Sequence, residues 1–523
     1  MSTDTHSPAA RHNSGSWITR WAEARPDTLA WADEHRRCSY ALAEDRIRRL
    51  TDWLARSGVV HGDRVALWLG NRGATLEALF ASARLGAIAL PLNARLTPSE
   101  VAFQLSDATP RALLVERSWR LRAADAIAIA RPVQPKQLEV GPDDTGRDAY
   151  EDALVASTST ARCEPVHPDD PMILMYTSGT TGKPKGALLP HRKTLYNSLN
   201  AERFFEIRKG DRVLVVAPLF HSLGLQILAI PALHAGASLF LQDGFDPERV
   251  WRAIEDEGIT YYGGVPTMHQ RLLAALDRAE PIARPPSSLR FAFTAGAAAP
   301  PELIHDFDRH GLLLKQGYGQ TETSILTCLD TDLALEKAGS VGRPVHHGEL
   351  RLVDPATLES NPERWRDVAP GEVGEIVVRG PITMLGYWRR PEATAETLRA
   401  GWLRTGDLAT RDDEFDITLV GRAREMYISG GENVYPAEIE ATLVEHPDVA
   451  EAAVVAISDP EWGEVGHAHI VPATSHGIDL EALAEWLRTQ LAPFKLPREI
   501  VIEAELPRTA SGKVQKHRLR SAG

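Results

Sequence analysis

Short apolar runs alternate with helical patterns along the first part of the chain. In residues 41–58, Ile47, Leu50 and Leu54 recur at helical spacing and share one face of a predicted helix. The apolar run "RVALWLG" follows, then the helical segment "TLEALFASARLGA" and the apolar run "IALPLN". Strand, helix and strand in this order predict parallel strands covered by helices.

The same alternation returns after residue 170. Each predicted strand is followed by a helical pattern or a glycine-rich turn, as a mostly parallel sheet requires. Because open α/β sheets bind ligands beyond the carboxyl ends of their strands, the residues that follow these strands are the candidates for chemistry. The predicted strands are "PMILMYTSG", "DRVLVVAP", "GASLFLQ", "TYYGGVP" and "LRFAFTAG".

The pattern changes twice in the last third of the chain. Glycine-punctuated short strands between about 339 and 421 predict a β-rich subdomain. A compact α+β piece follows, and its first helix is predicted to start at Pro436, since proline suits a first helical turn. We therefore expect a large N-terminal domain over residues 1–421 and a small C-terminal domain over residues 422–523.

Composition narrows the class of protein. A chain of 523 residues with 43% apolar residues exceeds what one core usually serves. The net charge of -13, without blocks of like charge, argues against nucleic acid or an anionic membrane as partner. Cys38, Cys163 and Cys328 are too scattered for disulfides or zinc, and we expect buried thiols. With no secretory signal and no apolar span, we expect a cytoplasmic protein without membrane insertion.

The segment "YTSGTTGKPKG", residues 176–186, indicates a phosphate-binding loop. It follows a strand predicted to end at Met175, and glycines free backbone N–H groups while hydroxyls add donors. A flexible surface turn is the alternative. The spacing is not that of the common nucleoside-triphosphate loop, because Thr177 stands five residues before Gly182 and Pro184 follows Lys183.

Three further charged residues are ambiguous when each is taken alone. Glu322, in "QGYGQTETS", suits Mg2+, which prefers oxygen ligands, but it also suits a helix cap. Asp407, in "GWLRTGDLA", is either a turn former or an acceptor for ribose hydroxyls. Lys513, near the C-terminus, would ordinarily be a solvated side chain.

The order of the motifs decides between these alternatives. The chain resembles the adenylate-forming superfamily of acyl-CoA synthetases, luciferases and nonribosomal adenylation domains, and most nearly its AMP-forming acyl-CoA synthetases. The resemblance runs from about residue 15 to the end. Its motifs are "YTSGTTGKPKG", "APLFHSLG", "TAGAAAP", "YGQTET", "GWLRTGD", "GRAREMYISGGENVYPAEIE" and "PRTASGKVQK".

This resemblance implies a fold and a two-step reaction. The fold is α/β, with a large N-terminal AMP-binding domain of two α/β subdomains and a β-rich, distorted-barrel subdomain, followed by a small mobile α+β C-terminal domain. A carboxylate attacks the α-phosphorus of ATP to give acyl-AMP and pyrophosphate, and CoA then gives acyl-CoA and AMP. The small domain pivots between the steps.

The resemblance also implies roles for particular residues. Glu322 holds Mg2+, Lys513 bridges the carboxylate and the α-phosphate, and Asp407 and Arg422 bind the ribose. The phosphates and adenine of ATP meet the remaining nucleotide-binding residues, which are Thr177, Ser178, Gly179, Thr180, Thr181, Gly182, Lys183, Lys185, Gly296, Ala297, Gly317, Tyr318, Gly319, Gln320 and Thr321.

The implied acyl pocket and CoA channel complete the site. Gly430 and Gly431 line the channel, and Arg424 stands at the hinge, where the family usually has Asp or Lys. His221 is a gate between pocket and channel, although a core histidine is the alternative. The pocket residues are His221, Leu225, Gly264, Thr294 and Ala295. Their apolar, small character indicates a monocarboxylic acid, aliphatic or aromatic.

Other functions stay open at this point. The acceptor could be a carrier protein in place of CoA, or a different acid or nucleophile could take part, as in nitrite-dependent diazotisation. An inactive protein that senses acyl or adenylate ligands is a third hypothesis, and retention of Lys513, Glu322, Asp407 and Arg422 argues against it. A homodimer is also left open.

Overall fold

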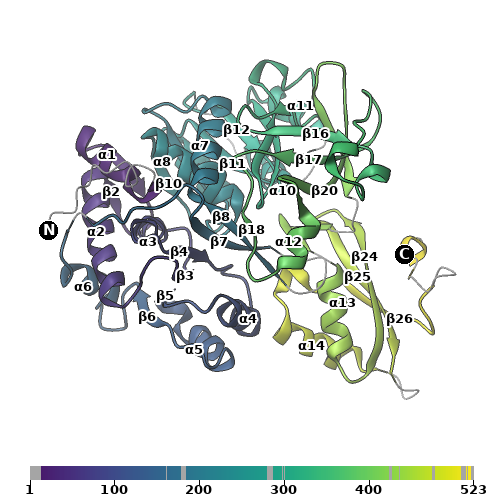
Figure 1. Cartoon of the computed structure of the whole chain (residues 1–523), viewed down its shortest axis with the longest axis horizontal. Helices are drawn as coiled ribbons and strands as arrows, with labels where there is room; N and C mark the ends of the chain where they lie inside the picture. Colours follow the sequence, from purple (N-terminus) through teal and green to yellow (C-terminus); the bar gives the residue numbers. More distant parts are fainter. Residues whose placement is uncertain are drawn as a thin grey trace.

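The computed structural model describes residues 13–160, 162–177, 184–278, 287–296, 299, 301–422, 427–434, 436–473, 478–507, 514 and 516–519. Figure 1 shows the N-terminal part on the left and the C-terminal domain at the lower right. Sheets with covering helices, a sheet of antiparallel strands and a separate C-terminal α+β domain confirm the predicted fold class. The domain boundary stays a prediction; β21 ends at Arg422 and β22 begins at Tyr427.

The first α/β layer is a seven-stranded sheet whose core strands are parallel. At one edge, β8 runs antiparallel to β7, and the two-residue strand β18 runs antiparallel to β8. This edge matters for function, because the loop between β7 and β8 is the predicted phosphate loop. In sheet order the strands are β18 (Gly386–Tyr387), β8 (Lys185–Pro190), β7 (Pro171–Thr177), β4 (Ile88–Pro91), β3 (Arg64–Trp68), β5 (Ala112–Glu116) and β6 (Lys136–Val140).

The second layer is a nine-stranded sheet, parallel from β1 to β13 and antiparallel at both ends. Its antiparallel turn from β13 to β14 contains Glu322. In sheet order the strands are β15 (Arg343–Pro344), β14 (Ser324–Cys328), β13 (Leu314–Gln320), β12 (Phe291–Thr294), β11 (Tyr261–Gly264), β9 (Arg212–Val215), β10 (Ser238–Leu241), β1 (Leu29–Ala32) and β2 (Arg37–Ser39).

Two smaller sheets complete the structure. The β-rich subdomain contains β16 (Glu349–Val353), β17 (Gly374–Arg379), β19 (Leu398–Arg399), β20 (Trp402–Arg411) and β21 (Ile417–Arg422). The C-terminal sheet contains β22 (Tyr427–Ser429), β23 (Glu432–Val434), β24 (Val449–Asp459), β25 (Gly463–Pro472) and β26 (Glu499–Ile502). Antiparallel neighbours dominate both sheets, as short strands joined by glycine turns require.

Helices cover the sheets as the hydrophobic pattern predicts. The predicted helix at 41–58 is α2, and Ile47, Leu50 and Leu54 are all buried. The helix predicted from Pro436 is α13. The α-helices are α1 (Trp17–Ala24), α2 (Tyr40–Arg56), α3 (Gly73–Arg84), α4 (Pro98–Ala108), α5 (Arg120–Ile129), α6 (Ala149–Val155), α7 (His191–Phe205), α8 (Ile230–Ala235), α9 (Pro247–Asp256), α10 (Pro266–Arg278), α11 (Pro301–Arg309), α12 (Pro391–Thr397), α13 (Pro436–Glu445), α14 (Leu480–Gln490) and α15 (Lys516–Leu519). Shorter turns are the π-helix η4 (Leu223–Ala229) and the 3-10 helices η2 (Ser14–Ser16), η3 (Arg117–Trp119), η5 (Thr331–Leu333), η6 (Pro355–Thr357), η7 (Pro362–Arg364) and η8 (Pro493–Lys495).

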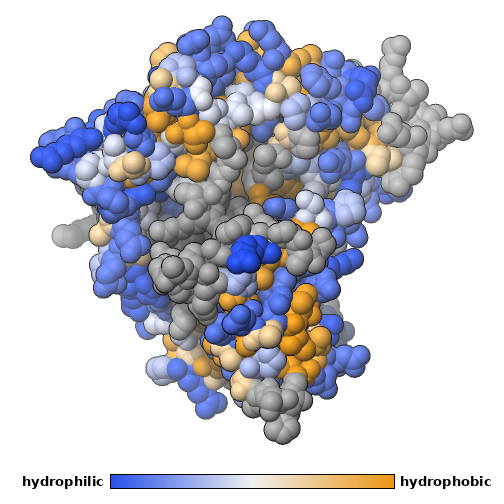
Figure 2. Space-filling view, turned by 90° about the vertical axis from the view of Figure 1, so that its right-hand side faces the viewer, coloured by the Kyte–Doolittle hydropathy of each residue, from blue (hydrophilic) through white to orange (hydrophobic). Residues whose placement is uncertain are grey.

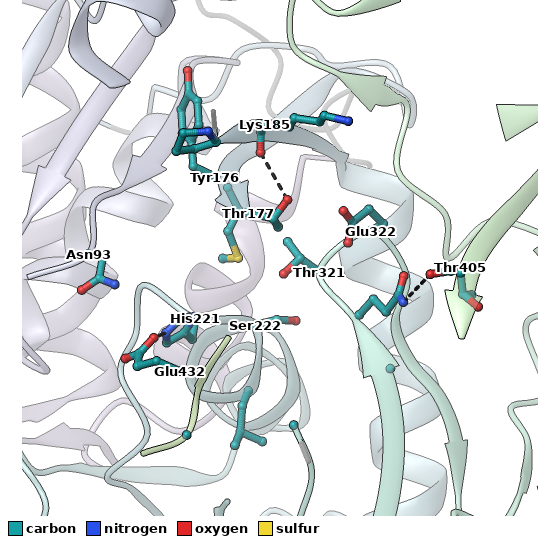
Figure 3. Close-up of a pocket in the computed structure, with 18 of the residues that line it drawn as sticks. Asn93, Tyr176, Thr177, Lys185, His221, Ser222, Thr321, Glu322, Thr405 and Glu432 are labelled. Carbon is teal, nitrogen blue, oxygen red and sulfur yellow. Dashed lines mark hydrogen bonds and ion pairs between the residues drawn. The ribbon is translucent and has the colours of Figure 1, made fainter. Parts of the chain in front are cut away.

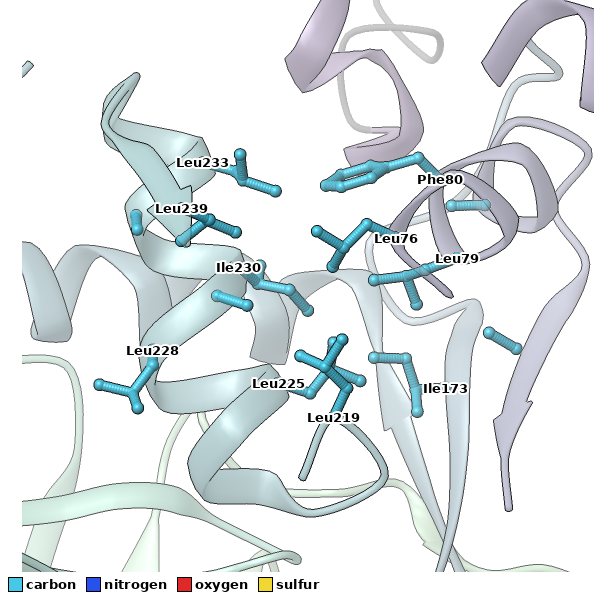
Figure 4. Packing of buried hydrophobic residues seen from close by; sticks show 14 of the residues in the cluster. Leu76, Leu79, Phe80, Ile173, Leu219, Leu225, Leu228, Ile230, Leu233 and Leu239 are labelled. Carbon is cyan, nitrogen blue, oxygen red and sulfur yellow. The ribbon is translucent and has the colours of Figure 1, made fainter. Parts of the chain in front are cut away.

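One apolar core joins the two α/β layers. Helix α3 is buried over its whole length, and its Leu76 and Phe80 face Leu225, Ile230 and their neighbours on η4 and α8, as Figure 4 shows. Burying these large side chains contributes roughly 1.5–3 kcal/mol each. The layers are thus held together by dispersion and the hydrophobic effect, and the loops at their shared edge keep fixed relative positions.

The surface and the cysteines agree with most of the composition argument. On the face that Figure 2 shows, hydrophilic residues predominate and the hydrophobic ones form separate patches. No helix in the described part of the chain has the length and apolar character of a membrane span. Burial raises the pKa of Cys38 and Cys328 to about 12, which keeps both as thiols. Cys163 is only partly buried, which corrects the prediction for that residue.

Candidate active site

A cleft of about 1040 Å³ lies where the edges of both α/β sheets meet the C-terminal domain. Figure 3 shows side chains from β7, β8, the β13–β14 turn and the C-terminal hairpin pointing toward one space. The predicted site residues that line it are Thr177, Lys185, His221, Ala295, Gly296, Gly319, Gln320, Thr321, Glu322, Gly430 and Gly431. The structure therefore collects residues that are far apart in the sequence.

The predicted phosphate side of the cleft begins at the β7–β8 hairpin. Strand β7 extends to Thr177, beyond the predicted end at Met175, because Thr177 pairs with Lys185 across the hairpin. The Thr177 hydroxyl donates to the Lys185 carbonyl at 3.4 Å. Both ends of the loop are thereby held at the cleft. Within the loop, Ser178, Gly179, Thr180, Thr181, Gly182 and Lys183 lie outside the described residues.

Glu322 presents its carboxylate to the cleft from the β13–β14 turn. Its side chain is largely buried, and the Tyr387 hydroxyl donates to Glu322 Oε1 at 2.8 Å. The Lys185 ammonium lies over the Tyr387 ring, 5.4 Å from its centroid. A buried, hydrogen-bonded carboxylate beside a phosphate loop is the oxygen donor that Mg2+ prefers, so the residues present fit this metal.

A buried lysine stands behind this carboxylate. Lys193 of α7 is fully buried, and its ammonium donates to the Ser324 hydroxyl. Burial lowers the pKa of Lys193 to about 7, against a weaker opposing effect of Glu322. Sequence analysis missed both Lys193 and Tyr387. The helical pattern could have indicated Lys193, because it shares the buried face of α7 with Asn197 and Ala201.

The predicted nucleoside side is built from β13 and β20. Asp407 is buried, and its Oδ2 accepts hydrogen bonds from the Tyr318 hydroxyl and from Gln320 Nε2, each at 2.5 Å. Asp407 pairs with Arg422 in the register of β20 and β21. A side chain at Gly319 would lie 1.7 Å from the Ser324 carbonyl, so the two strands can approach only with glycine there.

Other predicted nucleotide-binding residues surround this pair of strands. Gly317 leaves no room for a Cβ, which would meet the Phe293 ring at 2.8 Å. Gly296 has a φ of +87°, a conformation that favours glycine. Ala297 and the side chain of Arg422 lie outside the described residues. The described residues thus form a tight strand end beside a buried carboxylate.

The predicted acyl pocket divides into lining and supporting residues. His221 and Ala295 line the cleft together with Leu223, Val265 and Met268. Three other predicted pocket residues stand behind this wall: Leu225 packs in the apolar core, and Gly264 and Thr294 are buried in β11 and β12. This part of the wall combines the apolar Leu223, Val265 and Met268 with the polar His221.

The C-terminal domain supplies the opposite wall through the β22–β23 hairpin. Gly430 and Gly431 have φ values of +56° and +83°. A Cβ at Gly431 would meet Val265 Cγ2 at 2.8 Å, and one at Gly430 would meet the Trp462 ring at 2.6 Å. Glycine is therefore required twice, for the turn and for its close approach to the cleft.

Charged contacts fasten this hairpin to the N-terminal domain. Glu432 Oε2 lies 2.5 Å from His221 Nε2, and Glu432 Oε1 lies 3.0 Å from Arg95 Nη1. Burial acts to raise the pKa of Glu432, but His221 and Arg95 outweigh it and hold the pKa below its usual value. Glu432 is therefore ionised. Sequence analysis missed it, although a carboxylate directly after two glycines in the channel motif was the available signal.

A second contact between the domains centres on Lys495. Its ammonium lies 2.8 Å from Glu100 Oε1 on α4 and 2.9 Å from Glu438 Oε1 on α13. Nearby, Ala492 packs into an apolar cluster of the N-terminal domain that includes Leu96. Sequence analysis missed Lys495 because nothing local distinguishes it. Arg424 and Lys513 lie outside the described residues.

Comparisons with known proteins agree with this geometry. Residues 18–388 match the family described as AMP-binding enzyme, and residues 438–513 match its C-terminal domain. The chain is 40% identical over 509 residues to a feruloyl-CoA synthase of Amycolatopsis sp, covering 97% of this chain and 98% of that protein. It is 40% identical over 513 residues to an indoleacetate–CoA ligase of Aromatoleum aromaticum, covering 96% and 97%.

Solved structures show the same fold in two degrees of similarity. A double mutant of o-succinylbenzoate CoA synthetase from Bacillus subtilis, bound with a product analogue, gives a TM-score of 0.85 at 30% identity and covers 97% of this chain and 98% of that one. ATP-bound MatB from Rhodopseudomonas palustris gives a TM-score of 0.72 at the same identity and coverage. Because identity and coverage are equal, the difference between the two TM-scores reflects how differently these two solved chains are arranged in space relative to this one.

Proposed function

Since the chain belongs to the family of AMP-binding enzymes, we propose that it activates an aromatic monocarboxylic acid and transfers the acyl group to CoA. The protein is an AMP-forming acid–thiol ligase, as its curated relatives are. Ferulate and indoleacetate, named in two of these relatives, each combine an aromatic ring with one carboxylate. The aromatic acids named in these relatives carry the aromatic assignment, and the apolar Leu223, Val265 and Met268 in the cleft wall support it by offering surface to an apolar ring.

In the first step the acid carboxylate attacks the α-phosphorus of ATP, and the bond to the β-phosphate breaks. Lys185 and the loop donors hold the phosphates in line for this attack. Asp407 and Arg422 hold the ribose. Lys513 joins the carboxylate and the α-phosphate, a task for which a flexible ammonium is suited. Pyrophosphate then leaves.

Magnesium has a place in this step through Glu322. When bound, the ion neutralises charge on the phosphate oxygens. Glu322 would hold it, with the Tyr387 hydroxyl fixing the direction of the carboxylate. The chain's own residues thus supply one oxygen ligand and an electropositive loop.

In the second step the CoA thiolate attacks the carbonyl carbon of the acyl-AMP, and AMP leaves with the bonding electron pair. Gly430 and Gly431 form the wall along which the pantetheine arm enters, and their approach to Val265 supports this role. His221 gates the passage from pocket to channel, and its contact with Glu432 supports a gate that responds to the position of the C-terminal domain.

A panel of acids tests the proposal. We expect pyrophosphate release with ferulate and indole-3-acetate, weak release with octanoate, and none with amino acids or dicarboxylates. Adding CoA should accelerate AMP release and yield a thioester. Octanoate as the best acid would contradict the aromatic assignment. If CoA does not change the rate of AMP release while nitrite or a carrier protein raises it, the assignment of CoA as acceptor is wrong. A homodimer stays a prediction, to be checked by size-exclusion chromatography with light scattering.

A further inference from the structure

The two-residue strand β18 brings a tyrosine to the phosphate side of the cleft. Gly386 and Tyr387 pair with Leu188 and Ala187 of β8, the strand that leaves the phosphate loop. The pairing continues on both sides of β18, where Leu385 N donates to the Leu188 carbonyl and Trp388 N donates to the Gly186 carbonyl at 2.7 Å. The backbone of Tyr387 is therefore fixed to the same strand that carries Lys185.

The turn before α12 locks this position further. Gly386 has a φ of +143°, and a Cβ there would lie 2.6 Å from Thr394 Cγ2. The Thr394 hydroxyl accepts a hydrogen bond from Tyr387 N at 2.9 Å. The strand and the helix thus fix the backbone of Tyr387, which restricts the positions open to its phenol ring.

The side chain of Tyr387 touches two functional groups at once. Its hydroxyl donates to Glu322 Oε1 at 2.8 Å, and its ring lies under the Lys185 ammonium at 5.4 Å. A hydrogen bond to a charged carboxylate is stronger than one between neutral groups. A cation over an aromatic face is attracted by the ring quadrupole. One residue thereby orients a carboxylate and a cation that come from different sheets.

We propose that Tyr387 is a positioning residue that sets the direction of the Glu322 carboxylate toward Mg2+ and holds Lys185 over the phosphate site. Carboxylates that bind metals are themselves hydrogen-bonded, and removing such a partner typically lowers metal affinity about 10–100-fold. The inference rests on the proposed metal role of Glu322. Tyr387 itself touches neither metal nor substrate in this account; it acts through its two neighbours.

The hydroxyl and the ring can be removed separately. In Tyr387→Phe only the hydroxyl is lost, and we expect the half-saturating Mg2+ concentration in ATP–pyrophosphate exchange to rise about 10-fold. The KM for the acid should not change. Tyr387→Leu removes the ring as well. In this variant the KM for ATP should be higher than in Tyr387→Phe, because Lys185 also loses its contact with the aromatic ring. Binding of Mn2+ in the presence of ATP, followed by electron paramagnetic resonance, gives a readout independent of turnover.

Two further variants separate the inference from the proposed function. Tyr150→Phe deletes a phenol hydroxyl that donates to a carboxylate outside the cleft, Glu77, and should leave the half-saturating Mg2+ concentration unchanged. Glu322→Gln tests the metal role itself. If Glu322→Gln weakens metal binding and Tyr387→Phe does not, the inference about Tyr387 is wrong while the function stands. If Glu322→Gln leaves metal binding intact, the metal role fails and the inference fails with it. Thioester formation from supplied acyl-AMP reports that each variant is folded.

Discussion

The two walls of the cleft are held together in different ways. On the N-terminal side, Glu322 of the proposed phosphate wall is bonded to Tyr387, and Asp407 of the proposed nucleoside side is bonded to Tyr318, all inside the N-terminal domain. The opposite wall belongs to the C-terminal domain and contacts the N-terminal domain through the hydrogen bond of Glu432 with His221, the ion pair of Lys495 with Glu100, and apolar packing of Ala492. The first wall is continuous with the N-terminal core, and the second is held across the contact along which the proposed pivot would separate the two domains.

The two buried lysines show the same difference in electrostatic terms. Lys193, behind the phosphate wall, has a hydroxyl as its bonded partner in the described part of the chain, and burial lowers its pKa to about 7. Burial acts to lower the pKa of Lys495 too, but Glu438 and Glu100 outweigh it and raise that pKa. The partners of a buried charge offset the free-energy cost of its burial, whereas a buried charge without such partners lowers the stability of the fold. Among the described residues, Lys495 is thus paired across the contact between the domains, whereas Lys193 has no carboxylate bonded to it.

Replacing Lys513 should give the largest effect, because in the proposed mechanism its ammonium bridges the carboxylate and the α-phosphate during adenylation. Its described neighbours stay on the C-terminal domain, where Lys516 pairs with Glu440 at 2.7 Å and Leu519 packs beside Val455. If Lys513 reaches the cleft only in the adenylating arrangement, Lys513→Ala should lower ATP–pyrophosphate exchange by about 1000-fold. Thioester formation from supplied acyl-AMP should persist. Equal losses in both half-reactions would refute the proposal that Lys513 is at the cleft only during adenylation.

Gly431→Leu should give the converse, somewhat smaller loss. Its φ of +83° and the 2.8 Å from its Cβ position to Val265 Cγ2 leave no room for a side chain. We expect thioester formation to fall about 100-fold, because the added side chain would occupy the proposed channel and displace the incoming thiol. Pyrophosphate exchange should remain, because the phosphate wall is untouched.

A matched control isolates the channel from backbone strain. Gly463 also has a positive φ, of +81°, but a Cβ there meets only the Ile428 carbonyl at 3.7 Å. Gly463→Leu should therefore share the strain without closing the channel. If both variants lose thioester formation equally, the glycine hairpin is structural and our assignment of the CoA channel is wrong.

The sequence predicted local elements and motifs well and contacts between distant segments poorly. The helix containing Ile47, Leu50 and Leu54 was predicted because its spacing is local. The metal candidate Glu322 was found through its motif, but its partner Tyr387 was not, since their contact arises only when β18 joins the edge of another sheet. Glu432 could have been noticed beside Gly431.

Lys495 illustrates what spacing cannot reveal. Its partner Glu100 belongs to the other domain, so no periodicity within either segment records their contact. Leu225, predicted for the acyl pocket, shows the limit of motif transfer, because it points into the core that joins the two α/β layers. Residue type and motif predicted which side chains are candidates for catalysis or binding. Packing determines which of those side chains face the cleft.

The smallest expected effect is on stability, and its sign distinguishes the two buried lysines. Because the folded-state pKa of Lys193, about 7, lies below its ordinary value of 10.5, the unfolded chain binds more protons between these pH values, and the stability of the unchanged protein rises across that window. Lys193→Met removes the buried cation, so it should stabilise the protein by roughly 1–3 kcal/mol at pH 7. The gain should shrink toward pH 10, where the folded protein already has a neutral Lys193.

Lys495→Met should instead destabilise, because it leaves Glu438 and Glu100 buried without their cation. Urea unfolding midpoints of both variants at pH 7 and 9.5 measure this contrast. A loss of stability in Lys193→Met at pH 7 would mean that Lys193 is as well paired as Lys495, and the electrostatic distinction between the walls would then be wrong.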